Sequence, residues 1–281
     1  MTAKTDAIKD MKLYTHFERV DRELLASGKE ADSRLEPNDL YKYDHMNYYG
    51  TDAVANGIRM CSIDKASRVL DLGSGLGGPA RFISSESGAS VTALELQEDC
   101  SNKAKEYTDR CGITNITHVC ADFNSCDLDA MGLGKESFDA IVSWLVILHI
   151  DEKKQLFDRA ASLCKKGGFL YIEDFFMKSE FSSDEKTSLK KDVFCATLQT
   201  KDDYLKTVTQ AGFEVVSFDD LTDSWTDFVT KRRGTYIANK EATVKKHGEP
   251  TYDSQLYFFS AIEKLFHGGN LGGCRIVAKK V

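Results

Sequence analysis

Three carboxylates each follow a separate strand-like segment, at the position where a parallel sheet presents side chains to a ligand. Asp71 ends an apolar run and is followed by glycines at alternate positions. Glu95 ends the apolar run 89–94, and Asp122 follows the run 116–120. Because the carboxyl ends of parallel strands meet at one edge of an open α/β sheet, we expect the three acids to face one binding site.

The glycine-rich segment after Asp71 predicts a site for a nucleoside cofactor. A chain that turns tightly between a strand and a helix needs backbone angles that a Cβ resists, and the missing side chains let a ligand approach the backbone. Asp71 is suited to the ammonium group of S-adenosylmethionine, which NAD lacks at this place. The loop also satisfies the dinucleotide pattern Gly-x-Gly-x-x-Gly, or it is a structural turn, so both alternatives stay open. The glycines concerned are Gly73, Gly75, Gly77 and Gly78.

The two later acids help to separate these alternatives. Glu95 lies about 20 residues past the loop, as a ribose-binding carboxylate does with either cofactor; otherwise it is a solvated acid before the helix expected at 97–111. Asp122 can accept a hydrogen bond from an adenine amino group while Phe123 covers the base, unless the pair is a loop acid beside a core ring. A dinucleotide site leaves this pair without a role, so we favour S-adenosylmethionine. Further expected cofactor contacts are Ser74, Leu96, Gln97 and Leu145.

Four segments together resemble class I S-adenosylmethionine-dependent methyltransferases over residues 60–281. They are Val-Leu-Asp-Leu-Gly-Ser-Gly-Leu-Gly-Gly at 69–78, Ala-Leu-Glu-Leu at 93–96, Ala-Asp-Phe at 121–123 and Lys-Lys-Gly-Gly-Phe-Leu at 165–170. Upstream, the heptapeptide Asp-His-Met-Asn-Tyr-Tyr-Gly at 44–50 resembles the sarcosine/dimethylglycine N-methyltransferases. Those enzymes make glycine betaine and are related to the phosphoethanolamine N-methyltransferases.

The resemblance implies an α/β fold of the Rossmann-like methyltransferase type, with a seven-stranded, mostly parallel sheet flanked by helices. It implies an N-terminal helical lid over 1–64 and a methyltransferase domain over 65–281, in which an insertion at 176–200 and helices within 223–266 contribute to the acceptor site. The implied reaction converts sarcosine and dimethylglycine to glycine betaine and leaves S-adenosylhomocysteine, with no metal. The alternatives are another small amine such as phosphoethanolamine, an NAD-dependent oxidoreductase, and a non-catalytic cofactor-binding protein.

Methyl transfer to an amine needs a neutral nitrogen lone pair in line with the methyl carbon, and positioning supplies much of the catalysis. His149, after the expected fourth strand, is the candidate general base, unless it only makes a structural hydrogen bond. In the phosphoethanolamine relatives the matching histidine pairs with an N-terminal tyrosine, for which Tyr43, Tyr48 and Tyr49 are candidates. Leu145 replaces an acid of those relatives, so a mechanism that depends on this acid is in doubt, and dimethylglycine, a tertiary amine, needs no strong base.

Aromatic rings clustered before the glycine loop suit a methylammonium ligand, because ring faces attract cations. For each tyrosine, packing on the core is the alternative. The expected substrate contacts are Tyr49, His45, Asn47, Trp144 and Asn270, with Tyr41, Tyr43 and Tyr48 in the same cluster. A carboxylate substrate also needs a cation or several donors. The candidates are Arg232, Arg233, Lys178 and Arg275, each of which is otherwise a surface charge.

The composition favours a cytoplasmic protein that acts on a small molecule. A net charge of −7 and a pI near 5.5 argue against nucleic acid as a partner. There is no apolar run long enough for a membrane span and no secretory signal at the N-terminus. The eight cysteines lack the spacing of a zinc site, so we expect reduced thiols. A homodimer stays open.

From residue 67 onward the pattern alternates strand and helix, as in an α/β fold. The strands after the fifth are expected to be antiparallel. Expected strands are 68–72, 90–94, 116–120, 138–143, 168–174, 213–218 and 273–279. Expected helices are 5–36, 53–61, 79–87, 97–111, 152–164, 201–211, 223–247 and 252–266, with a further helix inside 176–200.

Overall fold

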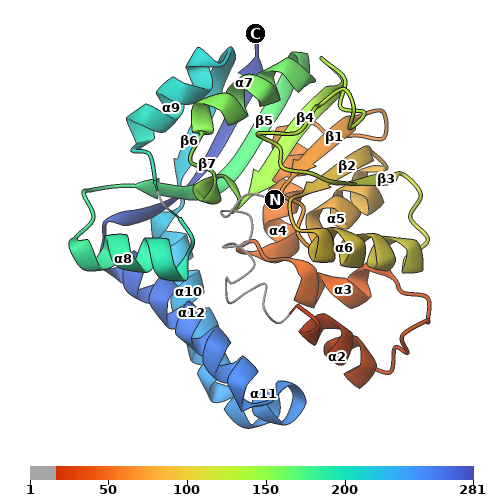
Figure 1. The fold of residues 1–281 in the computed structure, drawn as a ribbon, viewed down its shortest axis with the longest axis vertical. Helices are drawn as coiled ribbons and strands as arrows, with labels where there is room; N and C mark the ends of the chain where they lie inside the picture. The colour runs from red at the N-terminus through yellow and green to blue at the C-terminus, as the bar shows by residue number, and fades with distance from the viewer. Residues whose placement is uncertain (1–16, 196) are drawn as a thin grey trace.

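One seven-stranded sheet organises the computed structural model, which describes residues 17–195 and 197–281 (Figure 1). The strand order is β3-β2-β1-β4-β5-β7-β6, and β7 alone runs antiparallel to its neighbours. The expected α/β fold is therefore confirmed, but β6 was expected to be antiparallel and is parallel to the first five strands. The strands are β1 (Arg68–Leu72), β2 (Ser90–Glu95), β3 (Ile116–Cys120), β4 (Phe138–Trp144), β5 (Cys164–Met177), β6 (Phe213–Asp220) and β7 (Leu271–Lys280).

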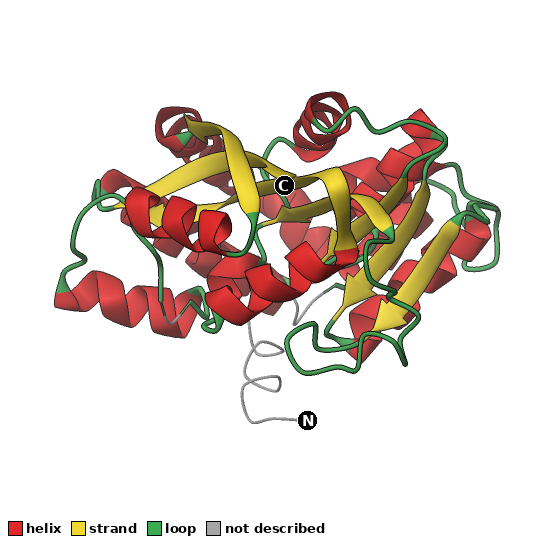
Figure 2. Cartoon of the chain, turned by 90° about the horizontal axis from the view of Figure 1, so that it is seen from above, coloured by secondary structure: helices red, strands yellow, loops and turns green. Residues whose placement is uncertain are grey.

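Alternate residues of the central strands pack into two different cores, because successive side chains of a strand point to opposite faces. Leu70 of β1 and Ile141 of β4 belong to one core, and Val69 and Val142 belong to the other. Helices cover both faces, as Figure 2 shows. One face carries α4 (Gly50–Met60) and α5 (Gly78–Ser87), and the other carries α7 (Lys153–Leu163) and α9 (Lys201–Gln210). Helix α6 (Glu98–Arg110) packs on β2 and β3.

A third group of helices gathers at the carboxyl ends of the strands (Figure 1). Its apolar core joins Phe175 at the end of β5 to Trp225, Phe258 and Ile262 from these helices. The helix expected over 223–247 is interrupted at Asn239, so it forms two helices. The members are α8 (Ser183–Asp192), α10 (Thr222–Ala238), α11 (Lys240–His247) and α12 (Glu249–His267).

The N-terminal part differs from the single helix expected over 5–36. Residues 1–16 lie outside the described part, and α2 spans only Arg19–Ala26. Gly28, with φ of 84°, follows this helix, and Pro37 starts a second helix, α3 (Pro37–Asp44). The prediction missed α3, which carries Tyr41 and Tyr43. The expected domain division at residue 64 stays a prediction.

A buried ion pair fastens the end of α3 to the glycine loop. The guanidinium of Arg81, whose side chain is 0% exposed, donates from Nη2 to Oδ2 of Asp44 at 2.7 Å. The same group donates to the backbone carbonyls of Leu76 and Ala104 and to the hydroxyl of Thr108. Nε of Arg81 and Oδ1 of Asp44 are buried without hydrogen-bond partners in the described part. The ion pair and these further contacts of the guanidinium hold the segment that begins at Asp44 against the loop and α6.

All eight cysteines are free thiols, as expected from their spacing. In the described part of the chain, no helix is long and apolar enough to cross a membrane. Among these same residues, no three His, Cys, Asp or Glu side chains come together as a group that could hold a metal ion.

Replacing Arg81 by Met should lower the free energy of unfolding by about 3–5 kcal/mol, because the Asp44 carboxylate is left buried without its partner. Urea denaturation of both proteins measures the difference. Lys154→Met is the matched control, since Lys154 forms an exposed ion pair with Asp158 and should change stability by less than about 1 kcal/mol. Equal effects of the two substitutions would contradict the structural role given to Arg81.

Candidate active site

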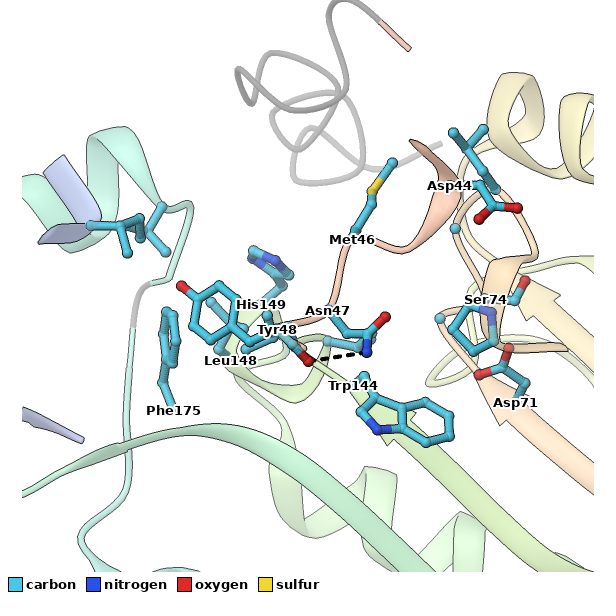
Figure 3. A pocket seen from close by; sticks show the side chains of 18 of the residues that line it. Asp44, Met46, Asn47, Tyr48, Asp71, Ser74, Trp144, Leu148, His149 and Phe175 are labelled. Carbon is cyan, nitrogen blue, oxygen red and sulfur yellow. Dashed lines mark hydrogen bonds between the residues drawn. The ribbon is translucent and has the colours of Figure 1, made fainter. Parts of the chain in front are cut away.

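A cavity lies at the carboxyl ends of β1 and β4, next to the glycine loop, with an empty volume of about 760 Å³ that is partly open to solvent. Figure 3 shows Asp71 and Ser74 on one side of it, and Tyr48 and His149 on the other. Strand β1 lies between β2 and β4, so the strand order reverses here: β2 and β3 lie on one side of β1, and β4 and the later strands lie on the other. This is the position at which open α/β sheets bind ligands.

The glycine loop has a shape that side chains would prevent. Gly73 has φ of 76°, and a Cβ added there would lie 2.4 Å from Cγ2 of Val146. The carboxylate of Glu95 accepts hydrogen bonds from the backbone N–H of Gly75 and of Gln97, each at 2.8 Å. Glu95 therefore ties the loop to the end of β2, and the loop leaves open backbone facing the cavity.

Polar atoms without partners line or adjoin the loop side of this cavity. Asp71 is 1% exposed, and its Oδ2 has no hydrogen-bond partner among the described residues. Burial, together with the nearby Glu95, raises the pKa of Asp71 to about 7. The Ser74 hydroxyl, which lines the cavity, and the Gln97 side-chain amide, which does not, are also buried without partners in the described part. Glu95 likewise lies outside the lining residues. A ligand with an ammonium group and further polar atoms would satisfy the atoms that lack partners.

The expected adenine contacts lie away from this cavity. Asp122 accepts a hydrogen bond from the backbone N–H of Asn124 at 2.9 Å. Phe123 is 4% exposed and packs in the core, with the Arg159 guanidinium 5.6 Å from its ring centre. Neither residue lines the cavity, and neither does Leu96. Their roles toward a cofactor stay predictions.

The opposite wall is aromatic. The ring of Tyr48 is buried and has its centre 4.8 Å from that of Trp225 and 5.1 Å from that of Phe228. The Arg232 guanidinium lies 5.1 Å from the centre of the Tyr48 ring. Trp144 lines the cavity as expected, and its indole N–H has no hydrogen-bond partner among the described residues. This wall combines ring faces, which suit a methylated amine, with one cation.

The other expected tyrosines do not reach this cavity. Tyr43 and Tyr41, on α3, line a second cavity instead. Tyr49 has a left-handed backbone (φ 59°), is 42% exposed, and donates from its hydroxyl to the carbonyl of Ser224 at 2.6 Å. Of the expected tyrosine cluster, Tyr48 is thus the member that lines the cavity beside the glycine loop.

His149 lines the cavity from a short 3-10 helix, η1 (Ile147–His149). Its Nδ1 lies 3.4 Å from the carbonyl oxygen of Phe194. Because a carbonyl only accepts, this contact places the ring proton on Nδ1 and leaves Nε2 with a lone pair. Burial lowers the pKa of His149 to about 4, so the ring is neutral at pH 7. In the described part, no hydrogen bond joins it to a tyrosine.

Two features that hold η1 in place involve β5. Leu145 has a left-handed backbone (φ 56°) and donates its N–H to the carbonyl of Glu173 at 2.8 Å. A branched residue in this conformation is strained, and such strain often marks functional sites. The buried Asp174 accepts a hydrogen bond from the N–H of Leu148 at 3.0 Å. Sequence reasoning missed Asp174, although a charged pair inside an otherwise apolar strand was a usable signal.

The remaining expected contacts fall into different places. Asn47 lines both cavities and His45 lines the second one. Asn270 lies outside both and donates to the carboxylate of Glu185 at 2.9 Å, which ties α8 to the start of β7. Of the four candidate cations, Arg232 alone lines a cavity. Arg233 pairs with Glu263 and Arg275 with Glu173, while Lys178 lies outside both cavities.

Comparison with known proteins agrees with this fold. Residues 34–218 match the family described as "Methyltransferase domain". The phosphoethanolamine N-methyltransferase of Plasmodium falciparum is 26% identical over 219 residues, which cover 76% of this chain and 79% of that enzyme. The sarcosine/dimethylglycine N-methyltransferase of Halorhodospira halochloris is 23% identical over 219 residues, 76% of each protein. A sterol 24-C-methyltransferase of Gibberella zeae is 25% identical over a shorter stretch, 57% of this chain and 43% of that enzyme.

Among solved structures, a phosphoethanolamine N-methyltransferase of Haemonchus contortus, in complex with phosphomonomethylethanolamine and S-adenosylhomocysteine, superposes with a TM-score of 0.82 at 18% identity. The similarity covers 99% of this chain and 60% of that longer one, and it concerns the fold. The alternative of an NAD-dependent oxidoreductase is wrong, because the matching family is one of methyltransferases. The chain belongs to the methyltransferase-domain family, and it is an S-adenosylmethionine-dependent methyltransferase.

Proposed function

We propose that the chain transfers a methyl group to the nitrogen of a small amine, with sarcosine and dimethylglycine as acceptors and glycine betaine as the product. The observation that carries this proposal is the composition of one cavity. Oδ2 of Asp71, which has no partner in the described part, lies on its glycine-loop side, and an aromatic wall around Tyr48 with the cation Arg232 lies opposite. Rings suit a methylated amine, and a guanidinium suits the carboxylate of such an acceptor.

We assign the cofactor contacts from the polar atoms that the fold leaves free. Asp71 would hold the ammonium group, and Ser74 and Gln97 would donate and accept at the neighbouring polar atoms. Glu95 would bind the ribose hydroxyls, since each carboxylate oxygen has a second lone pair beyond the one that accepts a backbone N–H. When bound, S-adenosylmethionine supplies the electrophilic methyl carbon.

His149 would orient the acceptor rather than act as a general base that takes the proton of the acceptor's ammonium group. With a pKa of about 4, the ring is a far weaker base than an alkylamine, whose ammonium form has a pKa near 10. Transferring a proton from that ammonium to the ring is therefore costly. The acceptor would instead react from its small neutral fraction, which has lost its proton to solvent. Nε2 can accept a hydrogen bond from the remaining N–H of neutral sarcosine and hold its nitrogen in line with the methyl group, whereas neutral dimethylglycine has no N–H and would be positioned by the aromatic wall. Leu145, which replaces the acid of the phosphoethanolamine relatives, supplies no charge to alter this balance.

Phosphoethanolamine is the second candidate acceptor. The enzyme of Plasmodium falciparum that bears this name covers 76% of the chain. A phosphate ester would use the same aromatic wall for its amine and the same guanidinium for its anionic end.

An acceptor panel tests the proposed reaction. With S-adenosylmethionine labelled in the methyl group, we expect label to appear on sarcosine and dimethylglycine when these are offered beside glycine, ethanolamine and phosphoethanolamine. Label on phosphoethanolamine alone would replace the leading acceptors by the second candidate. A protein that binds the cofactor and labels none of the five amines would refute the proposed N-methylation of these acceptors.

Replacing Glu95 by Ala should weaken binding of S-adenosylhomocysteine by about 1–3 kcal/mol, the range for a lost hydrogen bond to a charged group. Calorimetric titration measures the affinity. Glu98→Ala is the matched control, because Glu98 is exposed in the first turn of α6 and should leave affinity unchanged. Equal affinities of the Glu95 variant and the unchanged protein would remove the ribose assignment.

Replacing His149 by Ala should lower turnover with sarcosine about tenfold, the effect of one lost hydrogen bond in the transition state, and leave cofactor affinity unchanged. The unchanged enzyme should show no step in rate near pH 6.5 from this ring, because it stays neutral down to about pH 4. His118→Ala is the control, since His118 also has a pKa lowered to about 4 by burial but lies on β3, away from the cavity. Equal turnover in both variants would exclude His149 from the reaction.

A further inference from the structure

A second cavity adjoins the first on the side away from the sheet. It has an empty volume of about 1130 Å³, partly open to solvent, and lies among α2, α3, α10, α11 and α12. Met46, Asn47 and Arg232 line both cavities, so the two spaces meet at these residues. Figure 1 shows α10 to α12 on one side of this region and α2 and α3 on the other.

Buried hydrogen-bond donors without partners gather in this second cavity. Unsatisfied groups of this kind cost free energy and are rare in native proteins, so a cluster of them points to a missing ligand. Three helices contribute them, and all of them line the cavity. The donors without partners in the described part are Nη1 of Arg19, Nε and Nη2 of Arg232, the Tyr236 hydroxyl and Nε2 of Gln255. Two ring nitrogens of the lining, Nε2 of His45 and Nδ1 of His247, also lack hydrogen-bond partners there.

The charge of the cavity is positive. Glu23 is the one carboxylate among its lining residues in the described part, and it is already held by Lys246 at 2.6 Å and His247 at 2.7 Å. Glu18 and Glu23 interact electrostatically with Arg19, whereas Arg232 is surrounded by rings and lacks an acidic partner in the described part. Burial lowers the pKa of both arginines, as expected of buried cations whose charge is not fully balanced by nearby acids.

We propose that the second cavity binds an oxyanion, the phosphate or carboxylate arm of the acceptor, with the guanidinium groups of Arg19 and Arg232 in its lining as the cationic donors. Guanidinium forks match the planar or tetrahedral oxygens of such groups, and the Tyr236 hydroxyl and the Gln255 amide supply neutral donors. Arg232 stands where the cavities meet, so an anion bound there keeps the attached amine beside the aromatic wall. The acceptor part of this inference rests on the proposed function, while the oxyanion site does not.

Calorimetric titration tests the site. The full chain, saturated with S-adenosylhomocysteine, is titrated with inorganic phosphate and, in a parallel experiment, with acetate. We expect at least one anion to bind, and the tighter one identifies the chemistry of the acceptor arm. Arg19→Gln and Arg232→Gln should each weaken that binding about tenfold or more, the effect of losing charged hydrogen bonds. Arg34→Gln, whose side chain is 78% exposed, should leave it unchanged.

Tyr236→Phe keeps the test decisive if an arginine variant does not fold. This change removes only a hydroxyl and keeps the ring stacked on Tyr252 at 5.0 Å, so the fold should persist while anion affinity falls about threefold. Absence of binding by both anions, or binding that all the variants leave unchanged, would overturn the oxyanion site. Because the acceptor panel reports methyl transfer separately, a protein that labels an amine but fails this titration retains the proposed reaction and loses the site.

Discussion

The buried ion pair between Arg81 and Asp44 determines where the rest of the site can lie. A buried guanidinium needs fixed hydrogen-bond partners, and those of the two Nη groups of Arg81 come from α3, the glycine loop and α6. The segment 45–48, which reaches both cavities, starts directly after Asp44. The position of that segment is therefore set by an electrostatic requirement in the core rather than by contacts with a ligand.

The two cavities divide recognition by charge. On the sheet side, backbone groups and the carboxylate of Asp71 suit a cationic ligand. On the helical side, the guanidinium of Arg232 suits an anion. The two cavities meet at Met46, Asn47 and Arg232, and the ring faces on the sheet side favour the cationic form of a methylated amine. A zwitterionic acceptor placed across this gradient has one favoured orientation, which aims its nitrogen toward the glycine loop.

Local patterns allowed the sheet and the glycine loop to be predicted, because strand periodicity and tight turns depend on neighbouring residues. For the same reason Asp71 and Ser74 could be placed beside the loop, and both line the cavity. The tyrosines could not be assigned: Tyr43 lies on an unexpected helix, and the left-handed backbone of Tyr49 directs it to α10. The pairing of Asp44 with Arg81 spans 37 residues, and the place of Arg232 depends on how α10 packs on the sheet. Such partners follow from tertiary packing, which no single segment encodes.

The pKa of Asp71, raised to about 7, makes the proposed cofactor contact depend on pH. A carboxylic acid that is half protonated near neutrality must ionise before it can hold an ammonium group, so cofactor capture is thermodynamically linked to proton release. At lower pH, a proton then competes with the cofactor's ammonium group for the carboxylate of Asp71. Cofactor occupancy would therefore fall as the pH drops below about 7, even though the chemistry of the transferred methyl group does not depend on this proton.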